Sequence, residues 1–269
     1  GPSVATILVR LCGSSAYWVT IDIGLPAARA CLRFYCVAAA FASAWAQART
    51  ERPKRVGFLL AYAEDDPETK KRLAAFTRSL AALGCGVTPI VRVRAFDDLD
   101  AARILDAGAM GIVIPDVESA AQARRAVEIC KFAPLGARSV SAGYPAFGYR
   151  AVPAPEAART LNEETLLICM VETRKGIEHA DEIAAVDGVD VLFIGTSDLT
   201  AELGISGQMG HPKVVEAYKK VGEACAKHGK VLGMGGVYDE ENARRYVQMG
   251  SKFILSGNDH SYMMAGGKI

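Results

Sequence analysis

The chain has 269 residues, of which 51% are hydrophobic and 23% are charged. This length is sufficient for one large α/β domain or two small ones, each with a buried core. The 31 basic and 30 acidic side chains nearly cancel, so the charge balance predicts neither a nucleic-acid partner nor an anionic membrane surface. A small molecule is the expected partner.

The seven cysteines are scattered and form neither a CxxC pair nor a spacing typical of a zinc site. Most of them stand among apolar residues, and we interpret them as reduced thiols in a core. This pattern favours a cytoplasmic protein.

An apolar stretch, residues 27–49, has the layout of a secretory signal, with arginines before an apolar run and an A-x-A-like end. Because the stretch is internal and too short for a comfortable membrane span, we favour a packed helix and expect no membrane association. The signal interpretation holds only if the protein starts elsewhere.

Short apolar runs, most of them rich in β-branched residues, recur along the chain and predict eight strands. The runs are residues 18–23, 56–62, 88–93, 111–117, 166–172, 189–195, 230–236 and 252–257.

Segments of helical periodicity separate most of these runs, including residues 66–84 and 239–250. Unbroken apolar strands separated by helices indicate a parallel sheet covered on both faces. We therefore predict an α/β fold, a (β/α)8 TIM barrel in one domain over residues 1–269 that is irregular toward its N-terminus. An open doubly wound sheet is the alternative, although no Gly-rich dinucleotide loop follows an early strand.

A stretch punctuated by glycine and proline, residues 137–160, contains the aromatic residues Tyr144, Phe147 and Tyr149. A loop of this length in a compact domain is usually functional or mobile. We expect a βα insertion near the carboxyl ends of the strands, where barrel active sites form.

Ionisable residues stand at the predicted strand ends, which converge on one mouth of a barrel. They are Asp22, Arg92, Glu172 and Asp198. Glu172 and Asp198 come from neighbouring strands, and two such carboxylates can hold a hard divalent cation that leaves positions for water and substrate. Arg92 beside this cation would suit a substrate carboxylate.

The same residues also have plain structural interpretations. An acid after a strand often caps the next helix, as Asp198 in "GTSDLTAELG" would. Arg92 would equally serve in a surface ion pair. Composition and spacing leave these interpretations open.

Several long segments together resemble one enzyme family, the metal-dependent pyruvate aldolases of the 2,4-dihydroxyhept-2-ene-dioate aldolase and citrate lyase beta type. The resemblance runs from about residue 87 to the C-terminus and includes "LLICMVETRKG", "VLFIGTSDLTAELG" and "GKVLGMGG". It implies a (β/α)8 barrel, a homo-oligomer such as a hexamer, a bound Mg²⁺, Mn²⁺ or Co²⁺, and pyruvate enolate chemistry with an aldehyde as second partner.

The resemblance also implies roles for individual residues. Glu172 and Asp198 match the metal ligands, and Arg92 matches the group that meets the carboxylate and carbonyl end of pyruvate. Backbone amides near Thr196 and Ser197 would hold the same carboxylate. A bound cation would act as a Lewis acid on the oxo group.

One half of the expected catalytic machinery departs from the family. The base is a histidine that follows the segment matched by "WVTID", and here Gly24 and Leu25 stand where Glu and His are expected. Its partner aspartate is matched by Asp106 in "ILDAG", which the resemblance places among the catalytic residues. Among the four histidines, His211 and His260 are the candidates to replace the base, although His211 is better explained as a helix-start residue.

Residues 27–84 instead resemble the start of a periplasmic substrate-binding protein of an ABC transporter, so the chain looks composite. The leading hypothesis is a divalent-metal-dependent class II aldolase-like lyase that cleaves 2-oxo-4-hydroxy acids. The alternative is an impaired member that binds oxo acids and at most decarboxylates oxaloacetate. A periplasmic solute-binding protein is a third possibility, supported by residues 27–84 alone.

Overall fold

The computed structural model describes residues 3–11, 15–23, 55–60, 86–95, 100–141, 143–258 and 264. For the first three of these ranges only the backbone is described. The predicted helices within 27–49 and 66–84, and His260, lie outside the described residues.

Strands form at all eight predicted apolar runs, and the described part of the chain has one further strand, β1, that was not predicted. The strands are β1 Ser3–Leu11, β2 Ser15–Ile23, β3 Arg55–Leu60, β4 Gly86–Arg92, β5 Gly111–Ile114, β6 Leu166–Val171, β7 Val191–Gly195, β8 Val231–Gly235 and β9 Ser251–Asn258.

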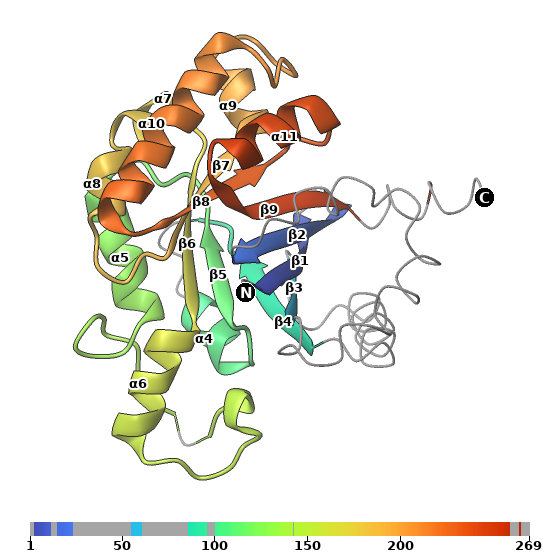
Figure 1. Cartoon of the computed structure of the whole chain (residues 1–269). Helices are drawn as coiled ribbons and strands as arrows, with labels where there is room; N and C mark the ends of the chain where they lie inside the picture. Colours follow the sequence, from blue (N-terminus) through green and yellow to red (C-terminus); the bar gives the residue numbers. More distant parts are fainter. Residues whose placement is uncertain are drawn as a thin grey trace.

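Hydrogen bonds join the strands in the order β1-β2-β9-β8-β7-β6-β5-β4-β3, and β1 also pairs with β3. From β3 through β9, each strand is parallel to its neighbours within this series. The described residues thus show an α/β fold with a curled parallel sheet (Figure 1). They differ from the predicted eightfold repeat because an antiparallel strand, β2, lies between β1 and β9.

The direction of β2 corrects one expectation about the mouth. Ile21 lies opposite Phe253 and Tyr17 lies opposite Asn258, so the carboxyl end of β2 is at the edge where β9 begins. Asp22 therefore does not lie with the carboxyl ends of the parallel strands, and its predicted position is wrong. The strand is reversed because it pairs with β1 as an antiparallel neighbour.

Helices pack on the outer side of β6, β7 and β8, with α5 against β6, α8 against β7 and α10 against β7 and β8 (Figure 1). The helices of the described residues are α4 Asp100–Asp106, α5 Ala120–Cys130, η2 Pro145–Phe147, α6 Ala154–Glu164, α7 Arg174–Glu178, α8 Ala180–Ala184, α9 Thr196–Glu202, α10 Pro212–His228 and α11 Glu240–Gln248.

The helix predicted within residues 239–250 is confirmed as α11. The Asp239 carboxylate caps this helix by accepting the backbone N–H of Asn242, and Gly250 follows the helix at φ 105°.

The residues of β6 alternate between two hydrophobic clusters, as the period of two in a strand requires. Leu167 and Cys169 pack with the helices. Ile168 and Met170 belong to a smaller cluster on the inner face of the curled sheet. Glu172 comes two residues after Met170, so the same alternation directs its side chain inward.

The alternation gives the same direction for two other positions. Ile90 on β4 and Phe193 on β7 both belong to the inner cluster. Arg92 and Gly195 each come two residues later, and they therefore face inward as well. The sheet thus gathers these positions on one face without any long loop.

The segment between α5 and β6 corrects the expectation for residues 137–160. It follows a helix and precedes a strand, so it lies at the amino ends of the strands, opposite to the predicted place. Part of it is helical, as η2 and α6. The aromatic residues stabilise this segment locally, because Tyr144 makes edge contacts with Phe132 and Phe147.

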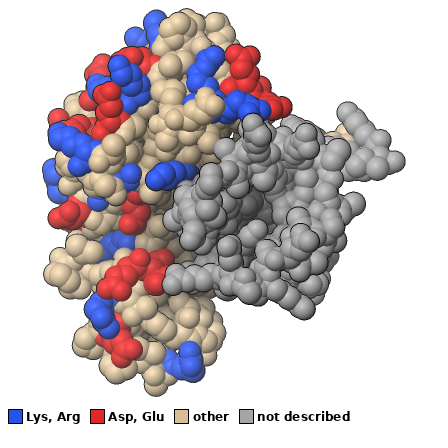
Figure 2. Space-filling view, viewed as in Figure 1, with Lys and Arg blue, Asp and Glu red and all other residues tan. Residues whose placement is uncertain are grey.

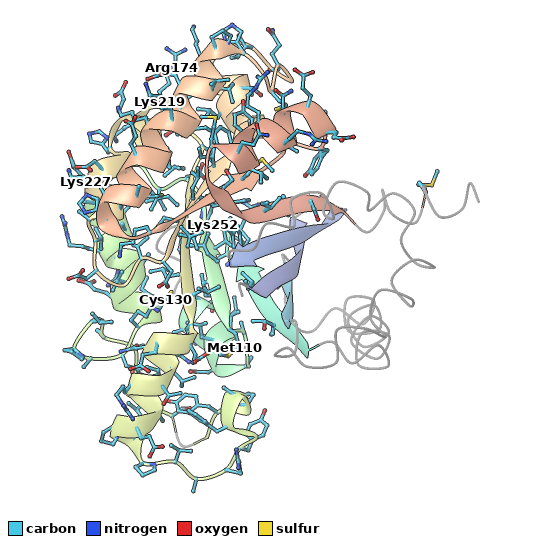
Figure 3. The ribbon with its side chains drawn as sticks, in the orientation of Figure 1. Met110, Cys130, Arg174, Lys219, Lys227 and Lys252 are labelled. Carbon is cyan, nitrogen blue, oxygen red and sulfur yellow. The ribbon has the colours of Figure 1, made fainter. Side chains whose placement is uncertain are left out.

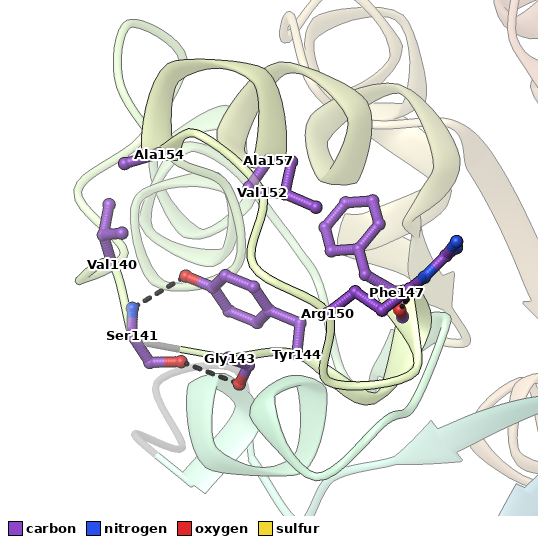
Figure 4. A pocket seen from close by; sticks show the side chains of 9 residues that line it. All are labelled: Val140, Ser141, Gly143, Tyr144, Phe147, Arg150, Val152, Ala154 and Ala157. Atoms are coloured by element: carbon purple, nitrogen blue, oxygen red, sulfur yellow. Dashed lines mark hydrogen bonds between the residues drawn. The ribbon is translucent and has the colours of Figure 1, made fainter.

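A cavity of about 180 Å³ lies in this segment. Its wall is drawn in Figure 4, where the Tyr144 hydroxyl accepts the backbone N–H of Ser141 at 2.7 Å. The lining residues are Val140, Ser141, Gly143, Tyr144, Phe147, Arg150, Val152, Ala154 and Ala157. None of them is a predicted site residue.

Three described cysteines, Cys130, Cys169 and Cys225, are buried and free. Burial raises the pKa of Cys130 and of Cys225 to about 12, so both remain protonated thiols near neutral pH. Cys130 lies at the end of α5 (Figure 3). The prediction of core thiols is confirmed for these three residues.

Charged side chains of both signs are interspersed on the described part of the face shown in Figure 2. Arg174, Lys219 and Lys227 lie on the outer helices (Figure 3), and Lys227 pairs with the exposed Asp181. Among the described residues, no helix combines the length and hydrophobicity needed to cross a bilayer.

Candidate active site

Glu172 is the buried acid of the candidate site. It directly follows β6 and is 4% exposed. Its Oε1 accepts the backbone N–H of Asp116 at 3.1 Å, and its Oε2 is buried without a hydrogen-bond partner. Burial is the main reason that the pKa of Glu172 rises to about 8, and the nearby Asp116 and Asp198 carboxylates also raise it.

Asp198 lies close enough to Glu172 for its carboxylate to raise the pKa of Glu172. Helix α9 follows β7 without an intervening loop, which puts Asp198 in the first turn of α9. The N-cap position belongs to Gly195, so Asp198 is not the cap residue. Unlike Glu172, Asp198 is exposed. The pair therefore consists of one buried and one solvent-exposed carboxylate.

Gly195 makes room for this pair. A Cβ atom at Gly195 would overlap Glu172 Oε2 and would lie 2.7 Å from Met170 Cε. Since the inner face at the end of β7 is occupied by the Glu172 carboxylate, glycine is the residue that fits there.

Thr196 and Ser197 lie in the same turn as Asp198. Thr196 is fully buried, and its hydroxyl shares a hydrogen bond of 2.8 Å with the Tyr218 hydroxyl. Ser197 is exposed, and its carbonyl accepts the Thr200 hydroxyl at 2.8 Å. The structure therefore brings four predicted residues, Glu172, Thr196, Ser197 and Asp198, to one end of β6 and β7.

Arg92 ends β4 and is half-buried. Its Nε is buried and has no hydrogen-bond partner. The pairing register places Arg92 opposite Val113, which in turn lies opposite Ile168. Arg92 thus faces inward, in register with Ile168 of β6, and its role stays a prediction.

Asp106 is not brought to these carboxylates. It ends α4, which leads into β5, and therefore lies at the amino ends of the strands. Its carboxylate pairs with Arg138 at 2.6 Å, and the Arg138 guanidinium stacks 4.5 Å from the Phe132 ring centre. The structure gives Asp106 a structural partner, and its catalytic role stays a prediction.

The described histidines have local contacts of their own. His211 is the N-cap of α10 and accepts the backbone N–H of Lys213 at 3.2 Å, as the helix-start interpretation predicts. His179 bonds the Lys175 carbonyl, and His228 bonds Asp181.

Comparison with known proteins identifies the family of this chain. A profile of the HpcH/HpaI aldolase/citrate lyase family matches residues 61–265. The chain belongs to this family. The match confirms the resemblance predicted from the sequence and begins earlier than the residue 87 expected there.

Related proteins that are named as aldolases support the predicted enzyme class, a carbon–carbon lyase. A 4-hydroxy-4-methyl-2-oxoglutarate aldolase of Hapsidospora irregularis is 35% identical over 217 residues, which cover 79% of this chain and 80% of the relative. A hydroxypyruvate/pyruvate aldolase of Delftia acidovorans is 35% identical and covers 77% of this chain and 75% of its own. Aldolases are carbon–carbon lyases, and the predicted enzyme class is confirmed.

Solved structures of the family agree with the fold. An HpcH/HpaI aldolase of Desulfitobacterium hafniense superimposes with a TM-score of 0.67 at 32% identity, covering 80% of this chain and 82% of that one. A family protein of Burkholderia cenocepacia gives a TM-score of 0.66 at 29% identity, covering 85% and 88%.

Two residues of the site were missed by the sequence reasoning. Asp116 follows β5 with a left-handed backbone at φ 53°, which is uncommon for a residue with a side chain, and its N–H holds Glu172. The dipeptide Pro115–Asp116 after an apolar run was an available signal for a turn. Tyr218 gave no such signal, since it occupies one more apolar position of a helix.

The residues present fit a hard divalent cation of the kind the family resemblance implies. Carboxylate oxygen is the preferred ligand of such cations, which often take only one or two protein carboxylates. The unpartnered Oε2 of Glu172 beside Asp198 is the observation that supports the fit. No group of three or more His, Cys, Asp or Glu side chains suited to a metal occurs within the described ranges.

Proposed function

We propose that this family member is a divalent-metal-dependent class II aldolase-like lyase that cleaves 2-oxo-4-hydroxy acids to pyruvate and an aldehyde. The observation that carries the proposal is the buried Glu172 oxygen without a partner, next to Asp198. The relative from Hapsidospora irregularis, which is named for a 2-oxo-4-hydroxy acid, supports the substrate class. We also propose that the curled sheet is a variant of the TIM barrel.

Each predicted residue has a specific task in this proposal. Glu172 and Asp198 would hold Mg²⁺, Mn²⁺ or Co²⁺, which would supply Lewis-acid stabilisation of negative charge on the oxo acid. Arg92 binds the carboxylate end of the oxo acid with a guanidinium that is free of protein partners at Nε. The backbone of Thr196 and Ser197 orients the same carboxylate.

Removal of the two acids tests the cation site. We expect Glu172→Gln and Asp198→Asn each to lower Mn²⁺ affinity, measured by calorimetry with oxalate present, by more than about tenfold. Asp181→Asn is the matched control, because Asp181 is an exposed acid paired with Lys227 on the outer helices. If the wild-type chain binds neither Mn²⁺ nor Mn²⁺ with oxalate, the proposal is wrong.

A second candidate function follows from the base. Among the described residues, His179, His211 and His228 form hydrogen bonds in or next to the helices. The positions directly after "WVTID", where the family resemblance implies the base, hold no histidine. An impaired lyase that binds oxo acids and decarboxylates oxaloacetate fits this pattern, since loss of CO₂ forms the enolate without removal of a hydroxyl proton. Normal aldol cleavage at high enzyme concentration, abolished by replacing one remaining histidine, would reject this candidate.

A further inference from the structure

Two tyrosines form a stacked pair on the helical side of the candidate site. Tyr218 of α10 and Tyr246 of α11 are both fully buried, with ring centres 3.7 Å apart and planes inclined by 13°. The Tyr246 hydroxyl donates to the Met209 carbonyl, which lies in the loop before α10. The pair thus joins α10 and α11 through two large, rigid side chains.

The two hydroxyls of this pair have different destinations. The Tyr218 hydroxyl bonds the Thr196 hydroxyl at 2.8 Å, whereas the Tyr246 hydroxyl bonds a loop carbonyl. Thr196 and Tyr218 are both fully buried, so neither hydroxyl can exchange its partner for bulk water. Their bond therefore fixes Thr196 against α10.

The turn that contains Thr196 has little freedom on its other sides. Gly236, at φ 79°, approaches so closely that a Cβ there would lie 3.0 Å from the Ser197 nitrogen. Thr200 donates its hydroxyl to the Ser197 carbonyl at 2.8 Å. A shift of Thr196 would therefore move the backbone of the turn as a unit.

Asp198 depends on this turn for its position. It comes two residues after Thr196, and its side chain is exposed, so the described residues do not enclose its carboxylate. Glu172, by contrast, is held by burial and by the Asp116 N–H. The distance between the two carboxyls is thus set on the Asp198 side by the backbone of residues 195–198.

We infer that Tyr218 is a positioning residue, whose hydroxyl holds Thr196 and thereby sets the place of Asp198 against Glu172. This inference rests on the proposed function of the two acids as cation ligands. A displaced Asp198 offers its oxygen at the wrong distance, and a hard cation is sensitive to such errors. The tyrosine pair thus gives helix α10 an influence on a site that it does not line.

Two matched substitutions test the inference. Tyr218→Phe and Tyr246→Phe each remove one hydroxyl from the same stacked pair, yet only the first removes the bond to Thr196. We expect both variants to lose a similar degree of thermal stability. Tyr218→Phe should also weaken Mn²⁺ binding by about threefold to tenfold in the presence of oxalate, and Tyr246→Phe should leave it within twofold of wild type, about the error of the measurement.

Thr196→Val supplies the reciprocal substitution, and the double variant with Tyr218→Phe should bind Mn²⁺ no more weakly than the poorer single variant, because both changes break one bond. Equal Mn²⁺ affinity of Tyr218→Phe and Tyr246→Phe, or full additivity in the double variant, would overturn the inference alone. Absence of Mn²⁺ binding by the wild-type chain would overturn the proposed function and the inference together.

Discussion

The Glu172 carboxylate is costly to keep charged where it stands. It is buried, its Oε2 lacks a partner, and Asp198 and Asp116 add negative charge beside it. Such an arrangement destabilises the ionised form and therefore the folded chain at high pH. A buried carboxyl group whose pKa is strongly raised is typical of a functional site.

The pH dependence of stability follows from this residue. The pKa of Glu172 rises from its ordinary value near 4.5 to about 8 on folding. The folded state therefore binds the proton more tightly, and stability falls as pH increases from about 4.5 to about 8. Below this window both states are protonated, and above it the loss is complete.

Glu172→Gln should remove this loss. With EDTA present at pH 9, we expect the variant to have a higher melting temperature than wild type and an unfolding free energy larger by on the order of a few kcal/mol. Near pH 4.5 the two proteins should be equally stable. Mn²⁺ at pH 8 to 9 should stabilise wild type and leave the variant unchanged. A melting-temperature difference that is constant across pH would contradict this linkage.

The β7–α9 junction is the element on which the site depends most. The strand ends at Gly195 and the helix begins at the next residue, so a strand-end position and a helix first turn meet within four residues. A methyl group at Gly195 would overlap the Glu172 side chain. This junction, and not a long loop, places Asp198.

Gly195→Ala should therefore disturb the site through size alone. We expect Mn²⁺ affinity to fall by about tenfold or more, because overpacking at this level costs roughly 1–3 kcal/mol. The matched control is Gly222→Ala within α10, where the added Cβ meets Leu232 at 3.4 Å in ordinary contact and helix propensity improves. Calorimetry with oxalate compares the two, and equal affinities would contradict the prediction.

Strands were predictable as elements but not in their directions. Apolar runs located β2 through β9, because buried parallel strands require continuous hydrophobic residues. The reversal of β2 depends on its pairing with β1 and β9. The residues of β2 itself do not indicate this pairing. The acids after β6 and β7 were found because strand ends are functional positions, whereas Asp106 was named through the family resemblance and its catalytic role stays a prediction.

At the scale of the whole molecule, the segment between α5 and β6 is tied to the sheet by one buried cation. Lys131 is 2% exposed and donates to the Asn162 carbonyl at 2.9 Å, the Thr165 carbonyl at 2.5 Å and Asp190 at 3.4 Å. Asp190 also accepts the Leu167 N–H. The lysine thus links α5, α6 and the starts of β6 and β7.

Lys131→Met should destabilise the chain without changing the site. We expect the melting temperature to fall by roughly 5–10 °C, since two buried carbonyls lose their partner. Lys227→Met is the control, because its ion pair with Asp181 is exposed and should contribute little. Mn²⁺ affinity should be unaltered in both variants, and a selective loss of affinity in Lys131→Met would show that this end of the molecule affects the carboxylates.

Every described residue of the candidate site lies between positions 92 and 236. The unusual strand β2, by contrast, lies among the first 23 residues, and among the described strands its hydrogen-bonded neighbours are β1 and β9. The proposed cation ligands and the antiparallel β1–β2 pair are therefore encoded in separate stretches of the chain. A change confined to β1 or β2 would therefore alter the sheet on the side away from Glu172 and Asp198 and leave both proposed ligands in the sequence.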